Sequence, residues 1–459
     1  MSRYIVFVAL VLAVWRIRQR GLQSAFLDVW LPIFLLIPVA FRVDIPGLPD
    51  PNFMQAAILP ILYGVMRQRA SQWRLGPMEG LVILYALMRV WADFLSRGYS
   101  DAQNYAFYML ASIIGPYVLG RWLIDSRRMD IDTARRFVLI FVLLFPLFLY
   151  EAKFWVNPIY KLLAPLFPSV GSGLSIRMGI ARTAGPFEHP ILACIMIIAA
   201  YRLHRWLCWM GQWRPPQPGW VGRWPQWTRG LPVKLDTQIS CVLVVMAVMT
   251  LSRGPWLGGL AGAAVAAAGQ AKNRRAALAA VLLALLIAGW LGQLALQAYI
   301  TPADGQILSG EAQTMLYRKS MVDQYQAFLF DKPWAGWGLT TVPKIRGMES
   351  VDNAFFLMAL QHGVPVAVLF AALLGLAIVS QLRFGLQAPV GHPPIGFSFA
   401  GIYVMCLVSF ATVYMGAQTE PLVFLLLGWG ESIKRRTAES WASVAEPAAA
   451  SFRFRRVLT

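Results

Sequence analysis

Apolar runs long enough to cross a lipid bilayer recur along this chain from its first residues to Glu431. A helix needs about 20 apolar residues to cross the ~30 Å hydrocarbon core of a membrane. Of the 459 residues, 58% are hydrophobic and only 14% are charged, which is more apolar than a soluble domain can bury. The sequence therefore predicts a polytopic integral membrane protein.

We expect an all-α transmembrane bundle of about thirteen helices, because a backbone in lipid must satisfy its hydrogen bonds internally. The predicted spans are 4–15, 22–41, 53–66, 78–95, 105–124, 137–156, 187–203, 238–251, 256–270, 276–298, 353–379, 395–413 and 421–433. The expected organisation is N-terminal membrane helices (1–156), a first periplasmic loop (157–186), central membrane helices (187–298), a large periplasmic loop (299–352), C-terminal membrane helices (353–433) and a cytoplasmic tail (434–459).

Basic residues gather in alternate loops of this predicted topology. The clusters lie at 16–20, 67–74, 121–136, 202–234, 272–275, 383 and 434–456, and they hold most of the 41 Lys and Arg residues. By the positive-inside rule these loops are cytoplasmic, which places the N-terminus outside and the C-terminus inside. Orientation explains the net charge of +19, so we expect membrane lipids and no nucleic acid as partners.

Two long loops, 157–186 and 299–352, then face outward. Loops of more than about 15 residues are usually functional or disordered. The second loop has helix-like apolar periodicity between Met315 and Leu329, so we expect amphipathic helices lying over an outward-facing cavity of the bundle.

Three arginines, Arg182, Arg253 and Arg318, lie on the outer face and depart from the orientation rule. Guanidinium groups bind phosphate bidentately and stay charged, so three of them meeting at one surface would suit a diphosphate. The alternative is that each pairs with a lipid phosphate or a nearby acid. Arg89 and Asp93, four residues apart on one predicted helix, are expected to neutralise each other.

Four sequence blocks occur in the order found in the O-antigen ligase and polymerase family. They read RTAGPFEHP around Arg182, LSRGPW around Arg253, YRKSMVDQYQAFLFDKPWAGWG around Arg318 and DNAFFLMALQHGVPV from Asp352. The chain resembles this family over roughly residues 182–370, about 40% of its length.

The resemblance implies a membrane-embedded glycosyltransferase of the GT-C-like class in the bacterial inner membrane, with its active face periplasmic. Its donor would be an undecaprenyl-diphosphate-linked oligosaccharide, and it would need no metal and no cofactor. Arg253 and Arg318 would bind the donor diphosphate, with Arg182 as a weaker candidate.

One departure from the family pattern falls at Asp352, where the family has a His that has been proposed to activate the acceptor hydroxyl. Asp352 can serve as the base instead, because a carboxylate stays ionised at neutral pH. Asn353, the next residue of the block, is expected to bind substrate; the alternative is that Asp352 and Asn353 cap the following helix. His189, with its neighbour Glu188, is a reserve candidate for substrate binding, against the alternative that both pack at a helix start.

The expected function is polymerisation of lipid-linked repeats into a surface or exopolysaccharide, because Asp352 departs from the ligase pattern. The alternative is an O-antigen ligase that transfers polysaccharide to a lipid A-core or protein acceptor. A flippase or exporter of lipid-linked oligosaccharide is the alternative from another class. A flippase and a chain-length regulator of the same pathway are possible partners.

Overall fold

A computed structural model describes residues 2–69, 75–171, 173, 175–177, 179–213, 233–300, 310–348, 350–389 and 394–445. The first part contains η1 (Ser2–Phe7), α1 (Val8–Arg20), α2 (Leu22–Ala25), η2 (Phe26–Trp30), α3 (Leu31–Leu36), α4 (Phe53–Arg69), α5 (Pro77–Arg97), α6 (Tyr99–Met109), η4 (Leu110–Ile114), α7 (Gly115–Leu123), α8 (Arg127–Phe154) and α9 (Pro158–Leu163).

The second part contains β1 (Ser175–Arg177), β2 (Ile180–Arg182), α10 (Pro190–Trp209), α12 (Leu235–Met249), α13 (Arg253–Ala268), α14 (Arg274–Ile300), α15 (Gly310–Asp331), α16 (Ala354–His362), α17 (Val364–Gln387), α18 (Ile395–Phe410) and α19 (Thr419–Ala445). The prediction of a helical protein is confirmed. The antiparallel hairpin β1–β2, which pairs Ser175 with Arg182, was not predicted.

Five of the described helical segments are long and apolar enough to cross a membrane: Tyr99–Leu123, Arg127–Phe154, Pro190–Trp209, Arg274–Ala295 and Val364–Gln387. Shorter apolar helices cover Leu22–Leu36, Leu235–Met249 and Ile395–Phe410. The expected number of about thirteen spans, the domain boundaries and the orientation stay predictions.

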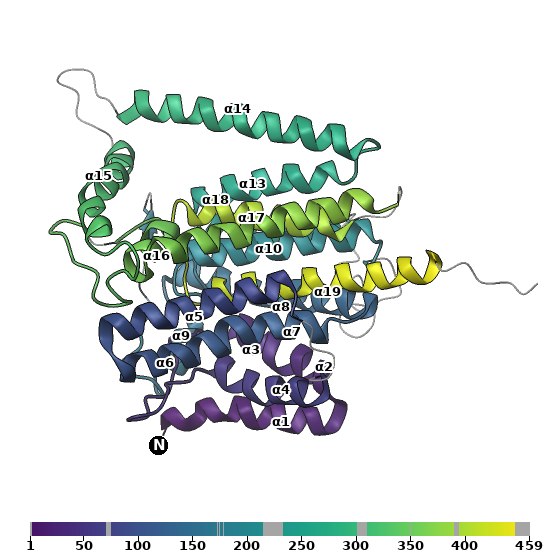
Figure 1. Cartoon of the computed structure of the whole chain (residues 1–459), viewed down its shortest axis with the longest axis horizontal. Helices are drawn as coiled ribbons and strands as arrows, with labels where there is room; N and C mark the ends of the chain where they lie inside the picture. Colours follow the sequence, from purple (N-terminus) through teal and green to yellow (C-terminus); the bar gives the residue numbers. More distant parts are fainter. Residues whose placement is uncertain are drawn as a thin grey trace, which may run out of the picture.

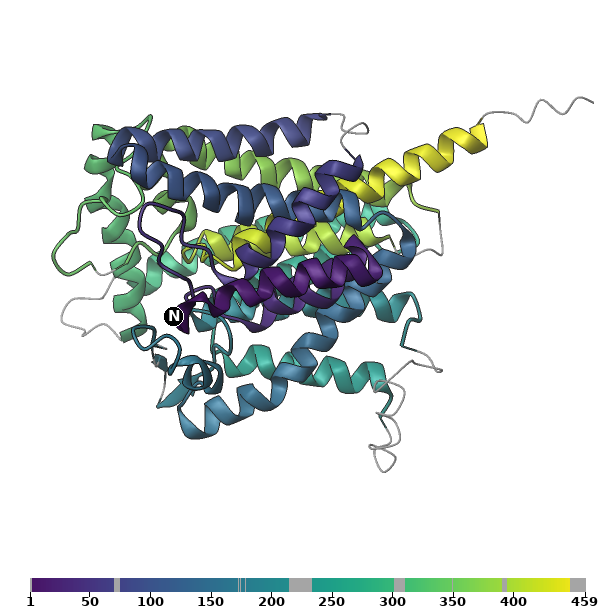
Figure 2. The same cartoon turned by 90° about the horizontal axis from the view of Figure 1, so that it is seen from below.

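The long helices run side by side between two ends of the bundle (Figures 1 and 2). One end, here called the α15 end, carries the chain's N-terminus and α15, which lies across the ends of the long helices (Figure 1). At the other end, here called the α19 end, α19 leads toward the C-terminus. The helix α15 is the element expected from the periodicity of the 299–352 segment.

Close helix crossings in the bundle depend on small residues. A Cβ atom added to Gly262 of α13 would lie 2.1 Å from the carbonyl oxygen of Gly401 of α18, and one added to Gly428 of α19 would lie 2.0 Å from that of Tyr117 of α7. Small residues at such crossings let helix backbones approach closely, which is how helices associate in lipid. These contacts fix α13 and α19 within the bundle.

Several described basic residues of the predicted cytoplasmic clusters pair with acidic residues of other helices. Arg121 donates from Nε to Glu79 at 2.9 Å, and Arg436 donates from Nη2 to Asp130 at 2.9 Å. Arg16 and Arg136 both pair with Asp28. Basic residues of three predicted cytoplasmic clusters, 16–20, 121–136 and 434–456, are therefore paired within the bundle, and the face on which they lie stays a prediction. Arg214, Arg223 and Arg229, from the cluster at 202–234, lie outside the described residues.

The predicted span 353–379 is two helices, α16 and α17, that are separated at Gly363. Gly363 has φ +92°, which side chains rarely allow, and an added Cβ would lie 2.3 Å from the carbonyl oxygen of Trp334. Pro365 then stands in the first turn of α17, where it begins a helix instead of kinking one. The sequence blocks around Trp334 and Gly363 are thereby in direct contact.

Candidate functional site

The turn between α12 and α13 is the centre of the candidate site, and Arg182 holds it in place. The buried Arg182 guanidinium donates from Nε to the Thr250 carbonyl at 2.9 Å and from Nη2 to the Ser252 hydroxyl at 2.9 Å. Its Nη1 donates to the Ser175 hydroxyl at 3.2 Å. Three of the five N–H groups of Arg182 thus bind protein atoms, which favours a role in positioning the turn.

A second arginine of the hairpin, Arg177, also binds this turn. It donates from Nη1 to the Leu251 carbonyl at 2.7 Å, and Leu251 itself has φ +48°, unusual for a residue other than glycine. Such backbone persists only where the surrounding structure holds it. The hairpin β1–β2 therefore fixes the turn that presents Arg253.

Arg253 is exposed and is the first residue of α13. The helix α13 begins toward the α15 end of the bundle (Figure 1). The amide N–H groups at the start of a helix favour anions, so a guanidinium there adds to an electropositive position. The following Gly254 lies so close to the turn after α18 that an added Cβ would be 2.7 Å from the Thr412 hydroxyl. The backbone that carries Arg253 is therefore fixed on both sides.

The start of α16 lies beside the same turn. The Ala354 amide donates to the Val413 carbonyl at 3.0 Å, directly after Thr412. Asn353 caps α16 by accepting from the Phe356 amide at 3.0 Å, which confirms the capping interpretation for this residue.

Asp352 is half-buried and accepts a hydrogen bond from the Ser350 hydroxyl on Oδ1 at 2.7 Å. The Asp352 carboxylate thus binds a side chain that precedes α16 in the chain.

The helix α15 contacts this segment through the residues that flank Arg318. Tyr317 donates from its hydroxyl to the Ser350 carbonyl at 2.9 Å, and the Met321 sulfur accepts from the Asp352 amide at 3.3 Å. Arg318 lies between them on α15, but its side chain lies outside the described part of the chain. The part of α15 around Arg318 nevertheless lies next to the chain at Ser350 and Asp352.

His189 lies within electrostatic range of Arg182, Arg177 and Asp352. The pKa of His189 is lowered to about 4, chiefly by burial; the positive charges of Arg182 and Arg177 also lower this pKa, and the charge of Asp352 raises it. The three charged groups therefore lie close enough to His189 to act on it electrostatically. His189 stands directly before α10, and its Nδ1 accepts from the Ile191 amide at 3.2 Å, as the packing alternative expected.

This contact determines which nitrogen of His189 carries the proton. A neutral imidazole with Nδ1 acting as an acceptor must hold its proton on Nε2. His189 at neutral pH can therefore donate a hydrogen bond but is a poor proton acceptor. Of the two side chains, Asp352 is the better candidate for a base.

Glu151 of α8 supports the segment that follows Arg182. Its carboxylate accepts from the Ala184 amide at 3.2 Å and from the Gly185 amide at 2.8 Å. Glu151 and Arg177 were not singled out from the sequence. The signal available was a lone acid near the end of a predicted span and a further arginine on the face where basic residues are depleted.

A buried polar network lies between α5, α6, α16 and α19. Arg89 pairs with Glu420 and donates to the Tyr85 hydroxyl at 2.8 Å, while the Tyr108 hydroxyl donates to Glu420 at 2.8 Å. The expected pair of Arg89 with Asp93 is wrong, because Glu420 takes that place and Asp93 accepts from the Leu339 amide at 3.3 Å.

Among the described residues, no group of three or more His, Cys, Asp or Glu side chains could hold a metal ion. Cavities of about 300 and 310 Å³ open away from Arg253, the first lined by Arg383 and Lys434 and the second by Arg20 and Asp125. The cavity expected beneath the 299–352 segment stays a prediction.

Residues 239–371 match the family model described as O-antigen ligase. This part of the chain belongs to the O-antigen ligase family. The family domain runs from α12 into α17 and contains Arg253, Arg318, Asp352 and Asn353, whereas Arg182 and His189 precede it. Membership implies a membrane glycosyltransferase of the ligase or polymerase type that acts on lipid-linked oligosaccharide. No curated protein matches the chain.

Proposed function

We propose that this O-antigen ligase family protein polymerises undecaprenyl-diphosphate-linked oligosaccharide repeats at the periplasmic face of the bacterial inner membrane. The observation that supports it most is the gathering of Arg253, Asp352, His189 and Arg182 around the α12–α13 turn. Cationic groups beside a half-buried carboxylate suit a reaction in which a diphosphate leaves while a hydroxyl loses its proton.

In the proposed reaction Arg253 and Arg318 bind the diphosphate of the donor. Asp352 takes the proton from the acceptor hydroxyl, whose oxygen attacks the anomeric carbon as the bond to the diphosphate breaks. Undecaprenyl diphosphate leaves with the bonding electron pair, and its added charge is stabilised by the arginines. Attack from the side opposite the leaving group inverts the anomeric centre, and the step needs no metal because diphosphate is already a good leaving group.

Arg182 is proposed to act through the turn that presents Arg253. Its guanidinium binds Thr250 and Ser252, and burial lowers its pKa to about 10, so it remains charged at neutral pH. We therefore assign Arg182 as a positioning residue. His189 would donate from Nε2 to substrate or to Asp352.

A ligase is the second candidate, because the family model is described as O-antigen ligase. The two activities differ in the acceptor: a sugar hydroxyl of the next lipid-linked repeat for a polymerase, and a lipid A-core or protein for a ligase. In the proposed pathway a flippase would supply the lipid-linked repeats, and a chain-length regulator would limit the number of repeats in each polymer.

Purified full-length protein incubated with undecaprenyl-diphosphate repeats tests these functions. A polymerase yields a ladder of longer lipid-linked products without any other acceptor. Products that form only when a lipid A-core or protein acceptor is added identify a ligase. Repeats that cross a liposome membrane without any new glycosidic bond identify a flippase and contradict the proposal.

A further inference from the structure

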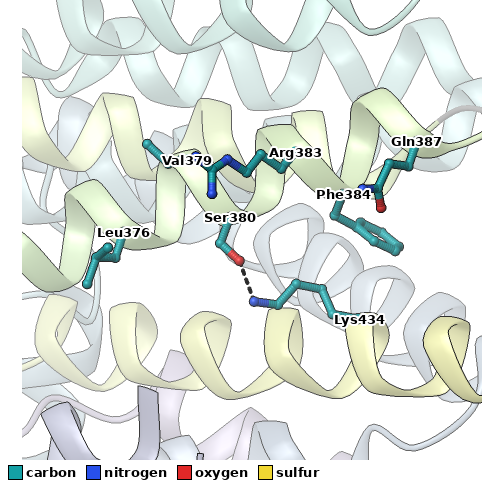
Figure 3. A pocket seen from close by; sticks show the side chains of 7 residues that line it. All are labelled: Leu376, Val379, Ser380, Arg383, Phe384, Gln387 and Lys434. Carbon is teal, nitrogen blue, oxygen red and sulfur yellow. Dashed lines mark hydrogen bonds between the residues drawn. The ribbon is translucent and has the colours of Figure 1, made fainter. Parts of the chain in front are cut away.

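A cavity of about 300 Å³ opens between α17 and α19, away from the candidate catalytic site. Its wall on α17 is formed by Leu376, Val379, Ser380 and Arg383, and its wall on α19 by Lys434 (Figure 3). The residues of α17 recur at spacings of three and four, so they lie on one face of the helix. The cavity therefore combines one continuous helix face with a cation from a second helix.

The polar part of this cavity is built for an anion. Lys434 is held there by the Ser380 hydroxyl and by Glu431, whose carboxylate lies 2.5 Å from its ammonium group. Among the described residues, no carboxylate lies within 4.0 Å of the Arg383 guanidinium. The two positive charges of Arg383 and Lys434 and the negative charge of Glu431 sum to one net positive charge. The Ser380 hydroxyl and the Gln387 amide, which also line the cavity, can donate hydrogen bonds. A phosphate monoanion complements that charge.

The apolar part of the cavity continues along the outside of the bundle. Leu376 and Val379 are 48% and 46% exposed on α17, a helix apolar enough to cross a membrane. Leu376 precedes Arg383 by seven residues, which is about 10 Å along a helix at 1.5 Å per residue. An acyl chain lying on Leu376 and Val379 would thus bring its headgroup phosphate to the level of Arg383.

We propose that this cavity binds an anionic glycerophospholipid, with its phosphate on Arg383 and Lys434 and an acyl chain against Leu376 and Val379. Charge complementarity and the adjoining exposed apolar face both favour a lipid over free phosphate, which would use only the polar half. The inference is independent of the proposed transferase activity.

Native mass spectrometry of the purified full-length chain in detergent tests this site, with phosphatidylglycerol, phosphatidylcholine and inorganic phosphate as probes. We expect the first phosphatidylglycerol to bind more tightly than phosphatidylcholine. Arg383→Gln should weaken that binding at least fivefold. Arg275→Gln is the matched control, because Arg275 is an exposed arginine at the start of α14 outside the cavity. It should leave binding unchanged.

Val379→Trp separates the two sources of phosphate and guards against misfolding of the Arg383 variant, because it blocks the apolar wall and keeps both cations. Loss of phosphatidylglycerol binding in Val379→Trp supports the lipid site. Unchanged lipid binding in both Arg383→Gln and Val379→Trp would overturn it. Displacement of phosphatidylglycerol by inorganic phosphate, with no effect of Val379→Trp, would assign the site to free phosphate and equally overturn the proposal.

Discussion

The Arg182 guanidinium donates from Nη2 to the Ser252 hydroxyl at 2.9 Å, across 70 residues of sequence. Ser252 directly precedes Arg253 and makes no side-chain cap to α13. The hydrogen bond therefore links the first sequence block of the O-antigen ligase resemblance to the second, and it fixes the residue beside the proposed diphosphate-binding arginine.

Ser252→Ala should lower the thermal unfolding midpoint and reduce glycosyl transfer. A hydrogen bond to a charged group contributes roughly 1.5–3 kcal/mol to the free energy of unfolding. Because the Ser252 side chain does not cap α13, the substitution removes no helix cap. Ser252→Thr retains the hydroxyl and serves as the control. Equal midpoints and equal transfer rates for the two variants would show that the contact with Arg182 does not position the turn.

Asp352→Asn should reduce turnover by at least about 100-fold, as expected when a general base is removed, and should leave donor binding within about twofold. The neighbouring Asn353→Ala is the control, because Asn353 caps α16. It should lower stability by about 1 kcal/mol and retain turnover per folded molecule. Single-turnover rates and donor titrations with both variants separate the roles, and retained turnover in Asp352→Asn would exclude the carboxylate as the base.

The pH dependence of stability tests the environment of His189. Its pKa is lowered to about 4 in the folded protein from the usual value near 6.5, so the unfolded chain binds more protons between these values. His189 therefore contributes stability that is present above pH 6.5 and is lost as the pH falls toward 4. His189→Asn replaces the Nδ1 acceptor with an amide oxygen that can still accept from the Ile191 amide, and it should remove this part of the pH dependence. Thermal midpoints measured from pH 4 to 7 with the same slope in both proteins would contradict the assignment.

Gly363→Ala should destabilise the protein by roughly 1–3 kcal/mol, because a side chain would adopt φ +92° and would meet the Trp334 carbonyl. Gly375→Ala is the matched control on α17, where an added Cβ meets nothing within 4 Å. It should be neutral or stabilise the helix by about 0.5–1 kcal/mol. Thermal unfolding of the two variants checks the break between α16 and α17, and equal midpoints would argue for a continuous helix.

The helical class could be predicted because apolar segments reflect local hydrophobicity, which a window of residues reports directly. The cap at Asn353 and the helix at 310–331 were likewise local signals. The break at Gly363 had a signal in the Gly and the following Pro365, but the apolar run that continues through it favoured one span.

Pairings between distant residues could not be predicted in this way. Arg89 pairs with Glu420 across 331 residues, whereas sequence spacing favours Asp93, four residues away, as its partner. Arg177 and Glu151 act on backbone groups of the turn and of the Ala184–Gly185 segment, for which sequence spacing carries no signal. These contacts follow from how the helices pack, which a single sequence does not specify.

Binding of an undecaprenyl-diphosphate-linked donor to Arg253→Ala is the most direct test of the central claim. Arg275→Ala, which removes an exposed arginine from α14 outside the site, is the control. We predict that Arg253→Ala weakens donor binding at least tenfold and abolishes the product ladder, while Arg275→Ala matches the parent protein in both. Parent-like donor binding and transfer by Arg253→Ala would contradict a diphosphate site at the α12–α13 turn.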